Sequence, residues 1–472
     1  MGIEFGTDGW RAVISEDFTF ANVRRVAQAI AKWVHESGLG SEPAMVVGFD
    51  TRFLSDRYAI EVARVLAGNG IRVHLTRADA PTPVVSFAIA HLAASGGIMI
   101  TASHNPPRYN GIKLKMASGG SASDADCRRV EQHLKQEDEI RDMEYDDALK
   151  RGLIERFDPA PAYAAQLGTL VRRDIISSRP GRVVVDAMYG AGRDYIRNWL
   201  AGTGWYVKQI RGELNPGFGG IHPEPIMPHL EALRKKVLAG HFPIGLATDG
   251  DADRTGAMDG WGRFVDPHAI FALVLRHLVE RRGLRGTVVK SVSTTRMVDR
   301  LCERYGLPLK ETPVGFGYIS DLMMSEDVLI GGEESGGISI KGHVPQGDGI
   351  LLGLLLLEIV AETGASLVEL LTDLQTSFGP THYARRDMKL ARPVNKKEMT
   401  IRLTGDAPAR IAGIDVQQVQ SNDGVKYLMS DGGWLLIRPS GTEAVLRVYA
   451  EAPEMRQTEA LLAYGQEVAW LA

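Results

Sequence analysis

Ser103 is the residue whose neighbours best suit it to act as a nucleophile. It belongs to the stretch Thr101-Ala-Ser-His-Asn-Pro106, which follows an apolar run at 97–100 that predicts a short buried strand. α/β proteins place reactive groups where a strand ends in a polar turn. His104 and Lys113 are close enough in sequence to act on the serine proton. The alternative is a capped turn without chemistry, so the choice depends on the rest of the chain.

A second candidate group is a trio of aspartates, Asp249, Asp251 and Asp253, separated by single small residues. Three carboxylates at the end of a buried strand repel one another unless a cation offsets their charge. Oxygen ligands without His or Cys favour Mg²⁺. An EF-hand does not fit, because its Gly and Glu positions hold Arg254 and Gly260. We therefore expect a magnesium site with room for a ligand from elsewhere; the alternative is a solvated acidic turn.

Three further turns carry groups that could bind a ligand. Arg438-Pro-Ser-Gly-Thr-Glu443, with Arg447 after it, offers hydroxyls, a glycine backbone and two guanidiniums, which suit a phosphate. Gly332-Glu-Glu-Ser335 offers acceptors and a donor that suit sugar hydroxyls. The tight turn Phe5-Gly-Thr-Asp-Gly-Trp-Arg11 would hold Arg11 in a fixed place. Each turn also has an interpretation without a ligand. In the order given, these are a hairpin with surface arginines, an exposed turn and an N-terminal turn.

The composition indicates a globular protein of two to four domains, because 472 residues exceed the roughly 250–300 that one core can serve. A net charge of −4 without a basic stripe argues against a nucleic-acid binder. Cys127 and Cys302 are far apart and fit a reducing cytoplasm. We expect no signal peptide, and the apolar run 350–357 is shorter than the ~20 residues of a membrane span. A buried helix capped by Asp348 is expected there.

Alternating strand and helix patterns organise the first part of the chain. They predict helices over 23–34, 58–66 and 84–91 and strands over 44–48, 71–75 and 97–100. A helix over 126–135 and a solvated acidic connector over 137–147 follow. We expect an interior sheet and place the first boundary near residue 150.

The same rhythm returns in two more units. The second predicts strands over 182–186, 205–210 and 244–247, helices over 192–200 and 228–238, and a structured loop over 212–225. The third predicts helices over 269–280 and 295–305 and strands over 287–290 and 328–330. The tail predicts paired strands over 434–437 and 446–450 and a closing helix over 453–468. The fold class is α/β: three similar mixed α/β domains, 1–150, 151–258 and 259–375, and a smaller C-terminal α+β domain, 376–472.

Taken in their order along the chain, these motifs resemble those of the α-D-phosphohexomutase family. The stretch around Ser103 resembles its phosphoserine loop, the aspartate trio its metal loop, Gly332-Glu-Glu-Ser335 its sugar loop and Arg438-Pro-Ser-Gly-Thr442 its phosphate loop. The resemblance covers nearly the whole chain. It implies four domains around a central cleft, the fourth of them mobile.

The resemblance implies transfer of a phosphoryl group between C6 and C1 of a hexose phosphate through phosphorylated Ser103 and a hexose 1,6-bisphosphate. Lys113 or His104 would move the hydroxyl proton, and Arg11 would steady the phosphoryl oxygens. Mg²⁺ would be held by a phosphoserine oxygen of Ser103 with Asp249, Asp251 and Asp253. The substrate would be bound by Arg254, Glu333, Ser335, Arg438, Ser440, Gly441, Thr442 and Arg447. The implied partners are small sugar phosphates, with no nucleic acid or membrane, for a monomer or homodimer in the cytoplasm.

The sugar preference is the open part of this interpretation. The Glu-Glu-Ser form of the sugar loop resembles that of phosphoglucomutases, so glucose phosphate is the substrate we expect. Mannose phosphate, or both sugars, is the second choice, and glucosamine phosphate is the least expected substrate. Gly317 stands where many relatives carry Lys, and Lys341 could supply the missing contact instead. A metal-dependent sugar phosphatase and a non-catalytic sugar-phosphate sensor are the alternatives from other classes.

Overall fold

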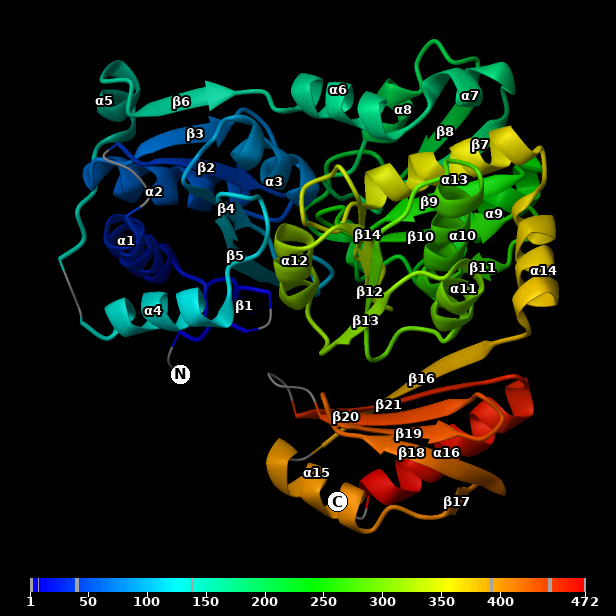
Figure 1. Cartoon of the computed structure of the whole chain (residues 1–472). Coiled ribbons are helices and arrows are strands. Elements are labelled where there is room, and N and C mark those ends of the chain that lie inside the picture. Colours follow the sequence, from blue (N-terminus) through cyan, green and yellow to red (C-terminus); the bar gives the residue numbers. More distant parts are fainter. Residues whose placement is uncertain are drawn as a thin grey trace.

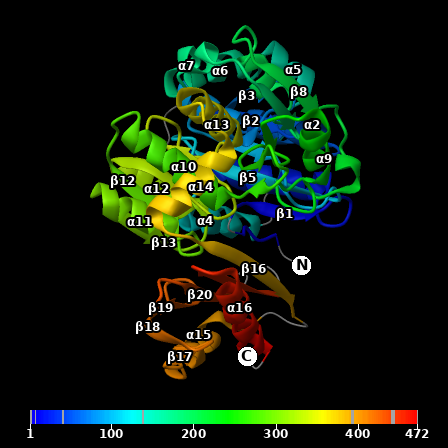
Figure 2. The same ribbon diagram turned by 90° about the vertical axis from the view of Figure 1, so that its right-hand side faces the viewer.

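The chain forms four β-sheets, one after another along the sequence, in the computed structural model, which describes residues 3–6, 8–38, 42–136, 139–390, 394–439 and 444–470 (Figure 1). The first three units lie together, and the fourth lies below them in both views (Figure 1 and Figure 2). The expectation of three mixed α/β units followed by a smaller α+β unit is therefore confirmed.

The first sheet is interior and mixed, with strand order β1-β5-β4-β2-β3-β6. Its strands are β1 (Trp10–Val13), β2 (Ala44–Phe49), β3 (Arg72–Thr76), β4 (Gly96–Ile100), β5 (Tyr109–Met116) and β6 (Ile154–Phe157). Along β2, Met45 and Val47 pack into one apolar cluster and Val46 packs into another, as expected for a strand covered on both faces. The covering helices are α1 (Phe20–Glu36), α2 (Ser55–Gly68), α3 (Thr82–His91) and α4 (Asp124–Leu134).

The first unit extends past the expected boundary near residue 150. β6 pairs in parallel with β3, and its first residue, Ile154, is buried, so this edge of the sheet forms only after that boundary. Part of the stretch expected to be a solvated connector is helical, as α5 (Tyr145–Lys150), because Ala148 is buried against the sheet's apolar cluster.

The second sheet has the order β11-β10-β9-β7-β8. Its strands are β7 (Arg182–Asp186), β8 (Tyr206–Ile210), β9 (Ile244–Thr248), β10 (Thr255–Asp259) and β11 (Phe264–Val265), and its helices are α6 (Ala160–Leu170), α7 (Arg173–Ser178), α8 (Tyr195–Trp199) and α9 (Glu231–Gly240). The expected boundary at 258 cuts β10, which pairs with β9 and β11. The helix expected over 192–200 is reduced to α8, and the expected loop contains the short 3₁₀ turn η1 (Phe218–Gly220).

The third sheet has the order β13-β12-β14-β15. It consists of β12 (Thr287–Ser291), β13 (Leu309–Thr312), β14 (Val328–Gly332) and β15 (Ile338–Ile340), with α10 (Pro267–Glu280), α11 (Met297–Tyr305), α12 (Phe316–Ser325), α13 (Gly349–Thr363) and α14 (Leu367–Phe378). The Leu-rich α13 is a buried helix, and Asp348 caps it by accepting from the backbone of Ile350 and Leu351, as expected. α13 packs against β9, β10 and α7 of the second unit as well as α10 of its own.

Among the described residues, no single helix has the length and apolarity that a membrane span requires. α13 and α14 meet those criteria only as a pair, with a bend of 84° between them.

The fourth sheet is antiparallel, with the order β16-β21-β20-β19-β18-β17. Its elements are β16 (His382–Lys389), β17 (Arg410–Ile411), β18 (Ile414–Gln420), β19 (Val425–Met429), β20 (Trp434–Pro439), β21 (Val445–Ala452), α15 (Lys396–Gly405) and α16 (Met455–Trp470). Val292 of the third unit joins Trp434, Leu436 and Tyr449 in a small apolar cluster. Beside it, Lys426 Nζ donates to Val292 O at 2.7 Å and to Glu311 Oε2 at 2.8 Å.

A buried carboxylate, Glu358 of α13, ties the second and third units together. It accepts hydrogen bonds from Arg172, His277 and Arg282, which lie before α7, in α10 and after α10. Burial would raise the pKa of Glu358, but the hydrogen bonds from His277 and Arg282 outweigh it and lower that pKa to about 2. The charged carboxylate therefore stabilises the fold.

Glu358→Gln should destabilise the protein at pH 7, because it removes the carboxylate that pairs with Arg282 and one of the two that pair with Arg172, the other being Glu362. We expect a loss of about 2–4 kcal/mol, less than for a fully buried pair because Arg172 is partly exposed. Since the folded pKa of Glu358 lies below the unfolded value of roughly 4.3, its contribution is present above that value and is lost as pH falls toward 2. Urea unfolding at several pH values between 7 and 3 measures this contribution. The difference in unfolding free energy between wild type and variant should become smaller as the pH falls.

Glu303→Gln, at an exposed position of α11, is the matched control and should stay within about 0.5 kcal/mol of wild type. Equal stability of the two variants at pH 7 would contradict the role given to Glu358.

Candidate active site

The loops that follow β4, β9 and β14 come together, although they belong to three different units. Ser103 Oγ donates to Asp249 Oδ2 at 3.0 Å, and both residues are fully buried. A Cβ built on Gly337, after β14, would lie 4.0 Å from Asp253 O. The structure therefore brings the serine loop, the aspartate loop and the loop carrying Glu333 to one place.

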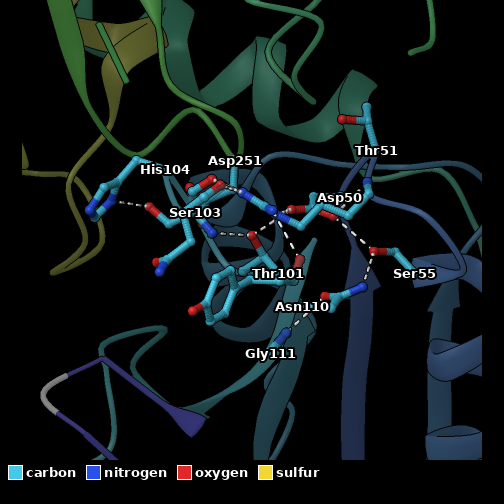
Figure 3. A network of polar contacts seen from close by, with 12 residues as sticks. Asp50, Thr51, Ser55, Thr101, Ser103, His104, Asn110, Gly111 and Asp251 are labelled. Atoms are coloured by element: carbon cyan, nitrogen blue, oxygen red, sulfur yellow. Dashed lines mark hydrogen bonds and ion pairs between the residues drawn. The ribbon is translucent and has the colours of Figure 1, made fainter. Parts of the chain in front are cut away.

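Ser103 has a backbone conformation that side-chain-bearing residues seldom adopt. Its φ is +50°, in the left-handed region. The Ser103 amide donates to Thr101 Oγ1 at 2.8 Å, and the Thr101 hydroxyl donates to Asp50 Oδ2 at 2.6 Å (Figure 3). These bonds hold the turn in this conformation and present the serine hydroxyl to Asp249.

Arg52, a residue that the sequence analysis did not single out, holds the serine loop in place. Its side chain is fully buried, and its guanidinium donates to the carbonyls of Ser103, Asn105, Pro106 and Tyr109 at 2.6–3.0 Å. Such a donor set is what a rigid, planar guanidinium offers and an ammonium does not. The sequence did contain a signal for this role, because the charged residues Asp50 and Arg52 follow the buried strand expected at 44–48.

Asp50 is the counter-ion of Arg52. Arg52 Nε lies 3.2 Å from Asp50 Oδ2, and Ser55 Oγ donates to Asp50 Oδ1 at 2.9 Å. Burial raises the pKa of Asp50 to about 6 in spite of the attraction of Arg52. The ring of Phe218, from the second unit, lies 4.9 Å from the Arg52 guanidinium. The support of the serine loop thus includes a side chain from η1.

The three aspartates form a buried group that fits a hard divalent cation. One carboxylate oxygen from each lies within 4.8 Å of the others. Asp251 Oδ1 and Asp253 Oδ1 are buried and have no hydrogen-bond partner in the described part of the chain. Burial and the neighbouring carboxylates of Asp253 and Asp251 raise the pKa of Asp249 well above its usual value. An oxygen-only donor set with unused buried acceptors suits Mg²⁺.

Lys113 partly neutralises this group. Its Nζ lies 2.9 Å from Asp251 Oδ2, Asp253 Oδ2 and Asp8 Oδ2, and its side chain is 2% exposed. Burial would lower the pKa of Lys113, but these carboxylates outweigh it and raise that pKa well above the usual value. Thr82 Oγ1, at the start of α3, also donates to Asp251 Oδ2 at 2.6 Å.

His104 and Arg11 both contact the serine loop's polar groups. His104 Nδ1 is 3.3 Å from Ser103 Oγ, and burial together with the nearby Arg254 lowers the pKa of His104 well below its usual value. Its imidazole is therefore neutral near pH 7. Arg11 donates to Asn105 Oδ1 and to Asp8 Oδ2, each at 2.6 Å.

Arg254 of the aspartate loop and Glu333 of the third unit interact through their charges. Glu333 Oε1 accepts from the amide of Gly315 at 2.7 Å, and burial raises the pKa of Glu333 to about 7. Arg254 lies 3.8 Å from Glu224 Oε1 and 3.9 Å from Asp253 Oδ1. Ser335 is half-buried in the turn after Glu333.

Two arginines of the fourth unit lie on neighbouring strands. Arg438 and Arg447 are directly opposite each other in β20 and β21. Arg438 Nε donates to Asp423 Oδ2 at 2.7 Å, and Arg447 Nε lies 3.7 Å from Asp387 Oδ2. Ser440, Gly441 and Thr442, which we expected to complete a phosphate grip, lie outside the described residues.

The suggestion that Lys341 replaces the lysine missing at 317 is wrong. β15 runs antiparallel to β14, so Lys341, whose amide bonds to Leu329 O, lies at the opposite end of the sheet from Glu333. Lys341 Nζ pairs there with Asp327 at 2.5 Å. Gly317 itself is in α12, and a Cβ built on it would meet no atom within 4 Å.

Four domain models of one family match the chain, and together they span most of its length. They are described as phosphoglucomutase/phosphomannomutase alpha/beta/alpha domains I, II and III, over residues 2–141, 161–262 and 266–378, and the C-terminal domain, over 394–464.

Similar proteins cover the full chain. The phosphoglucomutase/phosphomannomutase of Thermococcus kodakarensis is 30% identical over 474 residues, 98% of each chain. The phosphoglucosamine mutase of Corynebacterium jeikeium is 30% identical over 468 residues, 96% of each chain. A crystal structure of a putative phosphomannomutase from Thermus thermophilus superposes with a TM-score of 0.87 and 36% identity, over 99% of each chain.

Binding of Mg²⁺ should stabilise the protein, because the cation binds the folded aspartate group and not the unfolded chain. At about a hundred times the dissociation constant we expect roughly 2.7 kcal/mol. Asp251→Asn should abolish most of this effect. Thermal unfolding with and without Mg²⁺ measures it, and Asp174→Asn, at an exposed position of α7, should keep the full shift. The same Mg²⁺ shift in Asp251→Asn and Asp174→Asn would exclude the aspartates as the metal site.

Proposed function

This chain belongs to the phosphoglucomutase/phosphomannomutase family and is a phosphohexomutase, and we propose that it interconverts hexose 1-phosphate and hexose 6-phosphate through a phosphoserine at Ser103. In this proposal glucose phosphate is the preferred substrate. The observation that carries the proposal is the contact of Ser103 Oγ with Asp249 at 3.0 Å, made between residues 146 apart in sequence. It places a serine hydroxyl beside a carboxylate group suited to a divalent ion.

The reaction consists of two phosphoryl transfers. In the first, the bond between Ser103 Oγ and phosphorus breaks and the free hydroxyl of the bound monophosphate forms a bond to phosphorus, giving a hexose 1,6-bisphosphate. The bisphosphate turns round, and Ser103 takes the other phosphoryl group back. His104, 3.3 Å from Ser103 Oγ, and Lys113, among the carboxylates, are the candidates for carrying the hydroxyl proton.

Asp249, Asp251 and Asp253 would hold Mg²⁺ together with an oxygen of the phosphoserine. The ion, when bound, neutralises charge on the transferring phosphoryl group. Arg11, fixed by Asn105 and Asp8, steadies the phosphoryl oxygens.

The third and fourth units supply the residues that bind the substrate. Glu333 and Ser335 bond to sugar hydroxyls in both orientations of the bisphosphate, and Arg254, whose charge interacts with Glu333, binds the substrate with them. Arg438 and Arg447 hold the phosphate that is not reacting, with Ser440, Gly441 and Thr442. The fourth unit contacts the third through a small cluster and a few polar groups, which suits a domain that opens to exchange substrate.

The burial of Ser103 favours a mutase over a phosphatase. Its side chain is fully buried, so water has little access to a phosphoryl group attached there. Two free cysteines, Cys127 and Cys302, are consistent with a reducing cytoplasm.

Treatment with glucose 1,6-bisphosphate should add one phosphoryl group to the protein, on Ser103, and Ser103→Ala should not gain it. Intact-mass and peptide mass spectrometry detect the group. Mutase activity of Ser103→Ala should fall more than about a thousandfold, as expected when a covalent nucleophile is removed. Ser177→Ala, at an exposed serine, should behave as wild type. An active Ser103→Ala enzyme would rule out the phosphoserine mechanism.

Assays on glucose, mannose and glucosamine 1-phosphates should give the highest kcat/KM with glucose. Gly317→Lys should lower KM by about tenfold, because an ammonium at this open position of α12 can bond to the substrate phosphate. Gly168→Lys, at a helical glycine of α6 with equally open surroundings, should leave KM unchanged. Fastest turnover of the glucosamine compound would refute the glucose preference, and an unchanged KM in Gly317→Lys would show that position 317 does not face the substrate phosphate.

A further inference from the structure

Glu334, the middle residue of Gly332-Glu-Glu-Ser335, is engaged by groups that Glu333 does not contact. Glu333 accepts from the amide of Gly315 within the third unit. Glu334 Oε2 accepts from Ser293 Oγ at 3.1 Å, and Glu334 Oε1 lies 3.7 Å from a terminal nitrogen of Arg385, in β16 of the fourth unit. The Glu334 side chain is 8% exposed. Its carboxylate is therefore directed to the boundary between the third and fourth units.

Arg385 is the first of a row of charged groups that crosses the fourth sheet. Arg385 Nε lies 2.9 Å from Asp387 Oδ1, and Asp387 Oδ2 lies 3.7 Å from Arg447 Nε. Asp387 is directly opposite Arg447 in the pairing of β16 with β21, and Arg447 is directly opposite Arg438 in the pairing of β21 with β20. Charges of alternating sign thus connect Glu334 with the arginines proposed to hold a phosphate.

Two tyrosines of the fourth unit lie close enough to the Glu334 carboxylate to interact with its charge. Tyr449, directly opposite Arg385, is buried, and Tyr383 is half-buried. Burial and then the charge of Glu334 raise the pKa of Tyr383 well above its usual value and that of Tyr449 to about 12. In the described part of the chain neither hydroxyl has a hydrogen-bond partner. The ring of Tyr449 packs with Val292 of the third unit, so the apolar cluster at this boundary includes the residue directly opposite Arg385.

We propose that Glu334 is a positioning residue that sets the placement of the fourth domain, through Arg385 and Asp387, rather than a residue that contacts the sugar. The proposal rests on the proposed function. It assigns the two carboxylates of the loop different tasks: Glu333 faces the substrate, and Glu334 holds Arg447 where the non-reacting phosphate binds. It also means that the loop and the phosphate grip respond together when the bisphosphate turns round. A weaker hold on the fourth domain would let the bisphosphate escape between the two transfers.

The test is a double-mutant cycle with Glu334→Gln and Arg385→Met. For each protein we measure KM and kcat with glucose 1-phosphate and the concentration of glucose 1,6-bisphosphate that gives half-maximal activation. Each single variant should raise KM and the half-activating concentration about fivefold, with kcat within twofold, as expected for one partly buried ion pair. The double variant should be no worse than either single one, because both substitutions remove the same contact.

Two further readouts separate positioning from sugar contact. The ratio of kcat/KM for glucose and mannose 1-phosphates should change less than twofold in every variant. Hydrogen exchange of the β16 and β21 amides should be faster in Glu334→Gln and in Arg385→Met than in wild type. Arg386→Met is the matched control, because Arg386 is exposed, pairs with Glu459 of α16 and should leave every measurement unchanged.

The outcomes distinguish this inference from the function on which it rests. The positioning role would be overturned if the effects of Glu334→Gln and Arg385→Met on KM multiply in the double variant. A glucose-to-mannose ratio of kcat/KM that changes in Glu334→Gln alone would also overturn it. Either result would leave the proposed mutase function standing. Absence of turnover in wild type would overturn the proposed function. In that case the hydrogen-exchange result still decides whether Glu334 holds the fourth domain.

Discussion

The buried guanidinium of Arg52 is the interaction on which the arrangement of the serine loop depends. Four loop carbonyls accept from this guanidinium, one of them in a fully buried bond, and a buried carbonyl is costly without a donor. One planar cation satisfies all of them, and Asp50 balances its charge while also accepting from Thr101 and Ser55. The positive φ of Ser103 persists because this set of bonds over-determines the turn. The serine hydroxyl therefore approaches Asp249 at no further conformational cost.

Charge balance is the second constraint on the site. The three buried aspartates, Glu333 and the partly exposed Asp8 lie among Lys113, Arg11 and Arg254, and charges of neither sign could be packed there alone. Lys113 bonds to two of the aspartates, which explains how they remain buried next to each other. Lys113 bonds to the Oδ2 atoms of Asp251 and Asp253 and leaves their Oδ1 atoms unused, so Lys113 and a divalent ion would be coupled through the same two carboxylates.

Much of the fold could be predicted from the sequence, because strand and helix periodicity is local. The order of four short motifs was enough to identify the family, and the helices α1, α10 and α13 are present where their apolar spacing predicts them. The boundaries near 150 and 258 could not be predicted, since they depend on which strands pair: β6 joins β3, and β10 joins β9. Lys341 was misplaced for the same reason, because the direction of β15 relative to β14 decides which end of the sheet it occupies. Arg52 was missed because the carbonyls it bonds to are distant in sequence.

α13 belongs to the third unit by sequence but completes the core of the second, since it packs on β9 and β10. Its first residue, Gly349, lies so close to the second unit that a Cβ built on it would be 2.2 Å from Arg254 O. A gene rearrangement that exchanged the second unit between relatives would therefore leave a sheet face without its matching helix. The two units have to be inherited as a pair, whereas the fourth, with a core of its own, is the piece that recombination could replace. Because the proposed sugar loop lies in the third unit and the proposed phosphate-binding arginines in the fourth, such a replacement would leave the sugar loop in place and change the groups that bind the phosphate.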